Sequence, residues 1–188
     1  VSPDMAYCLS IRGVAREAGQ ALGVPFTDVV DRVVPAPVSA GYPVVLDDPA
    51  CSLFVALGVS GIDPAATSPR WLQRRLSAAG MRSISLPVDV TNYVMLEVGQ
   101  PLHAYDARKL QGPIRVRKAS ENESIVTLDD VRRSLSSDDL LITDDSGPIG
   151  IAGVMGGAST ECDPATTGIV LEAAAFDPPT ISRSMRRH

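Results

Sequence analysis

Aromatic side chains are scarce in this 188-residue sequence, at 4% of all residues. Surfaces that stack the bases of single-stranded nucleic acid need several aromatic rings, so this kind of site is not expected. Basic residues are also outnumbered, because 17 Lys and Arg face 22 Asp and Glu, which gives a net charge of -5. A domain that grips a nucleic-acid backbone alone is usually basic. If this protein meets nucleic acid, we expect another chain or domain to hold the backbone.

Cysteine and histidine are too few for a metal centre. The cysteines Cys8, Cys51 and Cys162 lie far apart, no C-x-x-C pair occurs, and His103 and His188 are the two histidines. We therefore expect no metal site. An odd number of scattered thiols favours a protein of the reducing cytosol, in which each cysteine is a small buried hydrophobic residue. No signal sequence and no apolar run near ~20 residues appears, so no membrane association is expected.

Hydrophobic residues, at 45%, are sufficient for one substantial domain or two small ones. Helical spacing of apolar residues predicts an amphipathic helix over 2–23, with Asp4 as its N-cap and Gly23 as its stop. A proline-containing linker is expected over 25–43. A second helix is predicted with Ser68 as its N-cap and Pro69 at its first position, and its buried stripe is expected to hold Trp71, Leu72, Leu76 and Ala79. A third helix is predicted between an Asp89 N-cap and Gly99.

Short alternating or apolar runs separated by turns predict strands in the rest of the chain. They are expected over 44–46, 51–62, 114–119, 124–128, 132–135, 140–143, 148–155 and 168–176, and Asp177-Pro178 opens a last helix. Helices in the first half and strands in the second favour an α+β fold with a curled, barrel-like, β-rich antiparallel or mixed sheet and flanking helices. We predict a helix and linker over 1–43 that pack on one domain over 44–188.

Polar residues stand among apolar ones in the stretch DVTNYVMLEVGQPLHAYD at 89–106. An Asp89 cap would place Thr91 and Asn92 in the first helical turn, where unsatisfied N–H groups gather. His103 follows the exit of the helix. Withdrawn polar groups are usually either paired internally or available to a ligand, so these three side chains form a candidate site.

A carboxylate interrupts the apolar strand GIVLEAAAF at 168–176. Alternation places Glu172 on one face with Val170 and Ala174, and both faces of this strand look buried. A buried charge needs compensation. Two interpretations stay open for Glu172: an ion pair with an arginine, or an acceptor for the hydroxyl or ammonium group of a ligand.

Clustered glycines follow in AGVMGG, Ala152 to Gly157. Glycines allow a backbone to approach a ligand and to present free N–H donors, although they more often mark ordinary turns. Neither phosphate-loop nor dinucleotide-binding spacing is present. The residues alone thus indicate an α+β domain with a candidate polar pocket of Thr91, Asn92, His103 and Glu172.

Nearly the whole sequence resembles a known family. The matching segments, in order, are CLSIRGVAREAGQALG, SPRWLQRRLSAAGMRSI, SISLPVDVTNYVMLEVGQPLHAYD, GPIRVRKA, TLD, DLLITDD, IAGVMGG and LEAAAFDP. Together they resemble the editing region of the bacterial phenylalanyl-tRNA synthetase beta chain. Family members are several times longer, so the resemblance implies an excised domain.

The resemblance implies a cytoplasmic parent enzyme of two alpha and two beta chains, which attaches phenylalanine to tRNA(Phe) with ATP and magnesium at sites elsewhere. It implies no cofactor in the present region. The region itself would receive the acceptor end of tRNA(Phe) and hydrolyse the ester when tyrosine has been attached by mistake. The alternatives are a non-catalytic scaffold or tRNA-interaction module of the synthetase, and a stand-alone domain that edits in trans.

Carried over by motif, the family's editing pocket falls on residues that were already candidates. The resemblance implies catalytic roles for His103, Asn92 and Thr91, and substrate-binding roles for Glu172, Gly153 and Ala152. Two positions depart from the family pattern. Asp130 stands where a glycine is usual in a turn, and Leu57 stands where an arginine is common.

Overall fold

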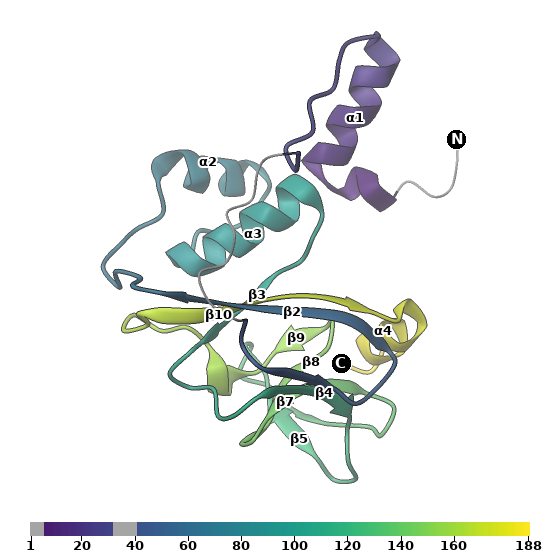
Figure 1. Ribbon diagram of the computed structural model, residues 1–188, viewed down its shortest axis with the longest axis vertical. Helices are drawn as coiled ribbons and strands as arrows, with labels where there is room; N and C mark the ends of the chain where they lie inside the picture. Colours follow the sequence, from purple (N-terminus) through teal and green to yellow (C-terminus); the bar gives the residue numbers. More distant parts are fainter. Residues whose placement is uncertain (1–5, 32–40) are drawn as a thin grey trace. The chain divides into compact units, whose positions relative to one another are not determined.

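The computed structural model describes residues 6–31 and 41–188, so the predicted cap at Asp4 and most of the predicted linker lie outside the described residues. The described chain divides into two compact units, and Figure 1 shows its elements. One unit comprises 6–31 and 67–102, and the other comprises 41–66 and 103–188. Residues 67–102, which the sequence assigns to the larger domain, therefore cluster with the N-terminal segment.

Helices build the first unit. They are a short 3-10 helix at Ala6–Leu9, α1 at Ile11–Leu22, α2 at Arg70–Ala78 and α3 at Leu86–Val98. The hydroxyl of Ser10 caps α1 by accepting from the N–H of Gly13, and Gly23 ends this helix in the left-handed region at φ 64°. α3 contacts both other helices. The predicted stripe of α2 is wrong at Trp71, which is 53% exposed, whereas Leu72 and Leu76 are buried.

The start of α3 differs from the prediction. The helix begins at Leu86 with Ser85 as its N-cap, and Pro87 lies in its first turn. Asp89 is fully buried, and its carboxylate accepts hydrogen bonds from the Ser68 and Ser83 hydroxyls, at 2.5 Å each, and from the Ile84 N–H. Asp89 therefore ties the preceding loop to α2 rather than capping the helix, and the predicted caps at Ser68 and Asp89 are wrong.

Strands build the second unit, which ends in helix α4 at Pro178–Met185. The strands are β1 Val44–Leu46, β2 Cys51–Ser60, β3 His103–Asp106, β4 Ile114–Lys118, β5 Ser124–Val126, β6 Arg132–Ser134, β7 Leu140–Asp144, β8 Gly147–Ile151, β9 Met155–Gly156 and β10 Gly168–Phe176. They form a five-stranded sheet β1-β4-β7-β8-β9, a three-stranded sheet β2-β10-β3 and a hairpin β5-β6. β1 and β4 are parallel, and the other pairs are antiparallel.

The predicted α+β class is confirmed. The described strands form separate sheets, and the barrel-like form is not confirmed.

The main core of this unit lies between the two larger sheets. It draws buried side chains from β2, β3, β4, β7, β8 and β10, among them Ala56, Tyr105, Ile114, Leu140 and Val170. Burial of such apolar surface is the main favourable contribution to folding. Because β10 is the central strand of its sheet, its inward residues are placed at this core, and Glu172 is one of them.

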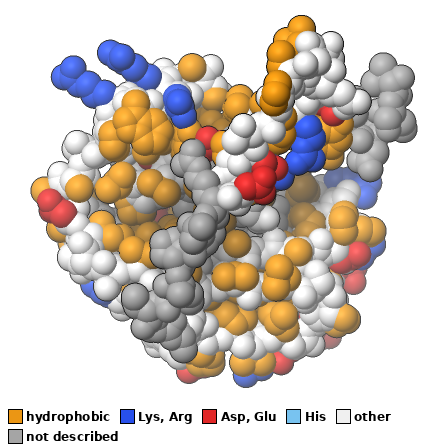
Figure 2. Space-filling view, turned by 45° about the horizontal axis from the view of Figure 1, so that its top comes forward, with side chains coloured by type: hydrophobic (Ala, Val, Ile, Leu, Met, Phe, Trp, Pro, Cys, Tyr) orange, Lys and Arg blue, Asp and Glu red, His pale blue; other side chains and the backbone are white. Residues whose placement is uncertain are grey.

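The outward side of β2 is apolar yet exposed. Leu53, Val55, Leu57 and Val59 alternate along the strand and are 57, 50, 43 and 37% exposed. Figure 2 shows hydrophobic side chains lying in patches on the visible surface of the molecule. Leu57, which departs from the family pattern, belongs to this outward row. Asp130, the other departure, adopts φ 60°, a left-handed conformation that aspartate tolerates better than most residues.

Candidate functional site

Two neighbouring antiparallel strands bring His103, Tyr105 and Glu172 together. Glu172 of β10 lies opposite His103 of β3, and Val170 lies opposite Tyr105. Directly opposed residues project to the same face of a sheet, and diagonal neighbours on that face remain within reach of an aromatic side chain. Tyr105 therefore approaches Glu172 diagonally, on the face that borders the core.

Glu172 is buried and bonded to a tyrosine. Its exposed fraction is 7%, and the hydroxyl of the fully buried Tyr105 donates to its Oε2. Burial raises the pKa of Glu172 to about 7, although the hydrogen bond from Tyr105 acts in the opposite direction. No ion pair with an arginine is formed between Glu172 and any described residue, so that interpretation is wrong. The Oε1 atom accepts no hydrogen bond from the described part of the chain.

His103 contributes a nitrogen without a partner. Its Nε2 atom is buried and makes no hydrogen bond to any described residue. The imidazole ring packs edge to face on Tyr105, with 4.5 Å between ring centroids. Burial lowers the pKa of His103 to about 4, so the ring is neutral at neutral pH. A buried polar atom of this kind can accept a hydrogen bond from a ligand or a water molecule.

Glycine at position 156 is required by the position of this ring. A Cβ atom on Gly156 would lie 2.5 Å from His103 Cε1 and 3.0 Å from Nε2. Strand β9 can thus pass directly against the imidazole only because this residue has no side chain. Gly156 is a site residue that the sequence reasoning did not identify.

Ala152 and Gly153 are neighbours in the turn between β8 and β9, but their surroundings differ. Ala152 is buried in the core, and its N–H donates to the carbonyl of Leu140 at 2.9 Å. Gly153 is exposed at φ 66°, and a Cβ atom there would lie 2.9 Å from Ile181 Cγ2. The hydrogen bonds among described residues do not use the Gly153 N–H. Ala152 is therefore a packing residue here, whereas Gly153 presents a free donor.

Thr91 and Asn92 lie in the helical unit. They occupy the second turn of α3, and Thr91 is buried with its hydroxyl donating to the Val88 carbonyl at 2.8 Å. The prediction that they lie at the N-terminal turn is wrong because the helix starts earlier than expected. Their role beside His103 and Glu172 stays a prediction.

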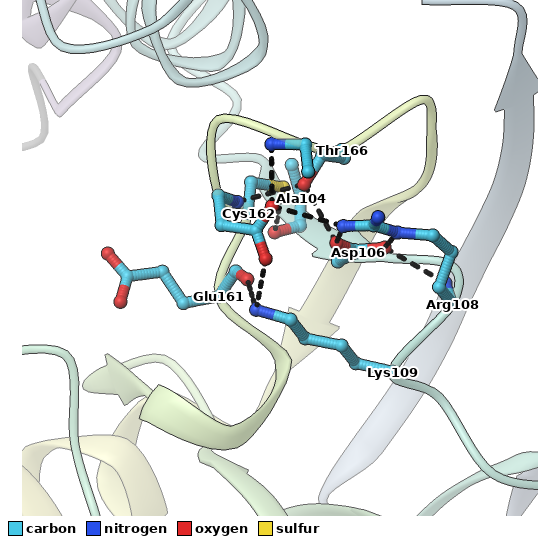
Figure 3. A network of polar contacts seen from close by, with 9 residues as sticks. Ala104, Asp106, Arg108, Lys109, Glu161, Cys162 and Thr166 are labelled. Carbon is cyan, nitrogen blue, oxygen red and sulfur yellow. Dashed lines mark hydrogen bonds and ion pairs between the residues drawn. The ribbon is translucent and has the colours of Figure 1, made fainter. Parts of the chain in front are cut away.

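A polar network anchors the strand that carries His103 and Tyr105 (Figure 3). Asp106, at the end of β3, is fully buried, accepts from both Nε and Nη2 of Arg108, and accepts from the Thr166 hydroxyl at 2.7 Å. Arg108 also contacts Asp163 at 3.1 Å, and Lys109 donates to the carbonyl of Glu161. The network joins β3 to the loop before β10, which fixes the two strands of the site at one end.

We expect Asp106→Asn to lower the free energy of unfolding by about 2 kcal/mol at pH 7, because it weakens the hydrogen bonds of a buried carboxylate while Arg108, at 45% exposure, stays solvated. Arg108 holds the pKa of Asp106 well below its usual range. The stabilisation is therefore present above the unfolded pKa of about 4 and is lost as pH falls through the lower folded value. Urea unfolding at pH 7 and at pH 3 measures both effects. The control is Asp163→Asn, which removes a carboxylate with 39% exposure from the same arginine and should cost clearly less than Asp106→Asn. Equal losses for the two variants would contradict this account.

The described residues hold no group of three or more His, Cys, Asp or Glu side chains suited to a metal ion. Strands β3 and β10 bring together a neutral histidine, a tyrosine and a carboxylate, and the Gly153 N–H of the turn between β8 and β9 stays a predicted member of the site. Tyr105 was missed by the sequence reasoning, although its two-residue spacing from His103 in a strand places both on one face.

Among the described helices, none is both long and apolar enough to cross a membrane.

Sequence comparisons find close relatives over the whole chain. It is 57% identical over 192 residues to the phenylalanine–tRNA ligase beta subunit of Streptomyces avermitilis and 57% identical over 189 residues to that of Thermobifida fusca. Each alignment covers 100% of this chain and 23% of the relative. The chain thus spans about a quarter of the length of these relatives, and the resemblance seen in the sequence is confirmed.

A solved structure and a family profile agree with this relationship. An N-terminal fragment of the phenylalanyl-tRNA synthetase beta subunit from Pyrococcus horikoshii matches with a TM-score of 0.53 at 15% identity, over 96% of this chain and 56% of that one, which supports the fold. The profile of the B3/4 domain matches residues 50–188. The chain therefore belongs to the B3/4 domain family.

Proposed function

We propose that this domain hydrolyses tyrosine from wrongly charged tRNA(Phe) as the editing region of a phenylalanine–tRNA ligase beta subunit. The observation that carries the proposal is Glu172, a buried carboxylate whose Oε2 accepts from Tyr105 and whose Oε1 accepts no hydrogen bond from any described residue. A carboxylate held in this way keeps acceptor positions that a ligand can use. A phenol hydroxyl supplies the missing donor.

Tyrosine differs from phenylalanine by this single hydroxyl. A hydrophobic synthetic site rejects an added hydroxyl only weakly, by ~100-fold, so errors of this kind need a second site. A site built to bond the hydroxyl can discriminate by ~10,000-fold or more, because the analogue without it leaves buried polar groups unpaired. In our proposal Glu172 accepts the hydroxyl proton and the Gly153 N–H donates to the hydroxyl oxygen.

Hydrolysis of an activated ester needs a positioned water and stabilisation of the developing charge. The unpartnered Nε2 of His103 suits an acceptor that orients this water or contacts the terminal adenosine. A pKa of about 4 makes His103 a weak base, so the ribose hydroxyl next to the ester is a second candidate for proton transfer. Thr91 and Asn92 are proposed to orient the ester and the ribose.

The full-length protein would act with an alpha subunit in an alpha2-beta2 tetramer in the cytoplasm, where the parent enzyme uses ATP and magnesium elsewhere. Other parts of that assembly would hold the tRNA body, because this chain carries a net charge of -5. We therefore expect the isolated domain to bind tRNA weakly.

A second candidate function is an interaction module of the synthetase. The exposed apolar row of Leu53, Val55, Leu57 and Val59 favours it, because such rows often mark contacts with another protein surface. This candidate does not account for the paired Glu172 or the unpartnered His103.

One assay separates these functions. Purified tyrosyl-tRNA(Phe) is incubated with the full-length synthetase, with the same enzyme lacking residues 41–188 of this region, and with the isolated 188-residue chain. We expect rapid release of tyrosine only with the intact enzyme. Release that is equal in the intact and deleted enzymes would contradict the editing proposal, and rapid release by the isolated chain would indicate a domain able to act in trans.

A further inference from the structure

Tyr105 holds a position that the proposed pocket does not otherwise use. We infer that Tyr105 is the positioning residue of the site: its hydroxyl holds one oxygen of Glu172 so that the other oxygen is free to accept the hydroxyl of a bound phenol. This inference rests on the editing function proposed above. In this inference Tyr105 orients the Glu172 carboxylate, and Glu172 recognises the substrate.

The geometry gives Tyr105 little freedom. The side chain is fully buried, its ring packs edge to face on His103, and β3 is fixed one residue later by the Asp106 network. Tyr105 is therefore a rigid donor, and its single O–H can satisfy only one oxygen of a carboxylate that has about four acceptor positions. The arrangement orders Glu172 without occupying Oε1.

No cation takes over this task in the described part of the chain. Ala56 of β2 lies directly opposite Glu172, and the titratable groups nearest to it on β3 are Tyr105 and the neutral His103. The charge of Glu172 also helps to raise the pKa of the Cys51 thiol of β2. Tyr105 provides the one side-chain hydrogen bond to Glu172 among the described residues. Because Tyr105 donates to the charged form, it lowers the pKa of Glu172 against the larger effect of burial.

Charge on Glu172 matters because a carboxylate accepts a hydrogen bond about twice as strongly as a neutral group. The Gly153 N–H already donates to the phenol oxygen in our proposal, so the second contact must accept. A protonated Glu172 would be a poorer acceptor and would present a competing donor. Tyr105 thus promotes the state of Glu172 that selects tyrosine.

The experiment uses the full-length synthetase with Tyr105→Phe. This variant keeps the ring against His103 and removes only the donor. The ratio of kcat/KM for hydrolysis of tyrosyl-tRNA to that of phenylalanyl-tRNA is measured from pH 5.5 to pH 9. For the wild type we expect the ratio to rise with a midpoint near pH 7. For Tyr105→Phe we expect the midpoint to move up by about one pH unit or more, the size given by loss of a hydrogen bond to a charged group.

The control is Tyr42→Phe, which removes the hydroxyl that donates to the Gly112 carbonyl at 2.8 Å in the same unit. Tyr42 packs against the same core, and its hydroxyl bonds Gly112 rather than Glu172, so the midpoint of Tyr42→Phe should equal that of the wild type. Glu172→Ala should abolish the pH-dependent ratio altogether. If the wild type shows no preference for tyrosine, or Glu172→Ala retains it, the proposed function itself fails.

If both of those results are as expected but Tyr105→Phe keeps the wild-type midpoint, the inference about Tyr105 is overturned. If near-ultraviolet circular dichroism shows that Tyr105→Phe is poorly folded, a second variant tests the inference. Incorporation of 3,5-difluorotyrosine at position 105 makes the phenol a stronger donor with little change of shape. We expect its midpoint to move below that of the wild type, and an unchanged or raised midpoint would equally overturn the inference.

Discussion

Replacement of Glu172 by alanine is expected to remove the preference of the synthetase for hydrolysing tyrosyl-tRNA over phenylalanyl-tRNA. The ratio of the two kcat/KM values should fall by about 10,000-fold at pH 8, to near one, because the proposed discrimination depends on the bond between Glu172 and the hydroxyl. The loss should come from the tyrosyl substrate, since phenylalanine has no hydroxyl for Glu172 to accept. Single-turnover hydrolysis of the two purified substrates measures the ratio.

Glu172→Gln is the matched variant for this prediction. Glutamine keeps the size of the side chain and one oxygen that can accept from Tyr105, but it carries no charge. We expect an intermediate loss and a ratio that no longer depends on pH near 7. A ratio within about twofold of the wild type for both variants, in enzymes that still aminoacylate normally, would show that Glu172 does not read the hydroxyl.

Replacement of His103 by alanine is expected to slow hydrolysis of tyrosyl-tRNA by about 100-fold, which is the lower end of the range for a group that positions or activates a reactant. The prediction follows from Nε2, which is buried, makes no hydrogen bond to the described part of the chain, and so is available to a water or to the terminal nucleotide. The preference for tyrosine should change much less than the rate. Rapid-quench measurement with saturating enzyme isolates the hydrolytic step.

Position 188 supplies a control for the loss of a histidine. The Nε2 atom of His188 is 2.9 Å from Oδ2 of Asp139, a carboxylate that also pairs with Arg187. His188 plays no part in the proposed site. His188→Ala should leave the hydrolytic rate unchanged. Full hydrolysis by His103→Ala would remove His103 from the mechanism and leave the ribose hydroxyl as the group that moves the proton.

Much of the second unit could be predicted because its strands carry local signals. Alternation in GIVLEAAAF placed Glu172 with Val170 on one face, and β10 extends over the predicted residues Gly168–Phe176. The strand-by-strand reading indicated a buried carboxylate that needs a partner. It could not name that partner, because the register of β3 against β10 is set by long-range pairing and not by either strand alone.

The helical unit shows why the rest could not be predicted. Asp89 has the residue type and place of an N-cap, yet its carboxylate is bonded by the hydroxyls of Ser68 and Ser83. These are contacts from outside the helix, which a local reading does not contain. The prediction failed at Trp71 for a related reason, because its ring packs on Tyr93 of α3 and on the Arg75 guanidinium and stays 53% exposed. Tertiary context overrode local preference at both residues.

The central claim is that Glu172 and the Gly153 N–H recognise the hydroxyl of a bound tyrosine. A structure of the full-length synthetase with a non-hydrolysable tyrosyl-adenosine analogue tests it most directly. We predict that the phenol oxygen lies about 2.5–2.9 Å from Glu172 Oε1 and accepts from the Gly153 N–H, while Tyr105 remains on Oε2. A phenol bound away from Glu172, with both carboxylate oxygens unchanged from the free protein, would contradict the claim.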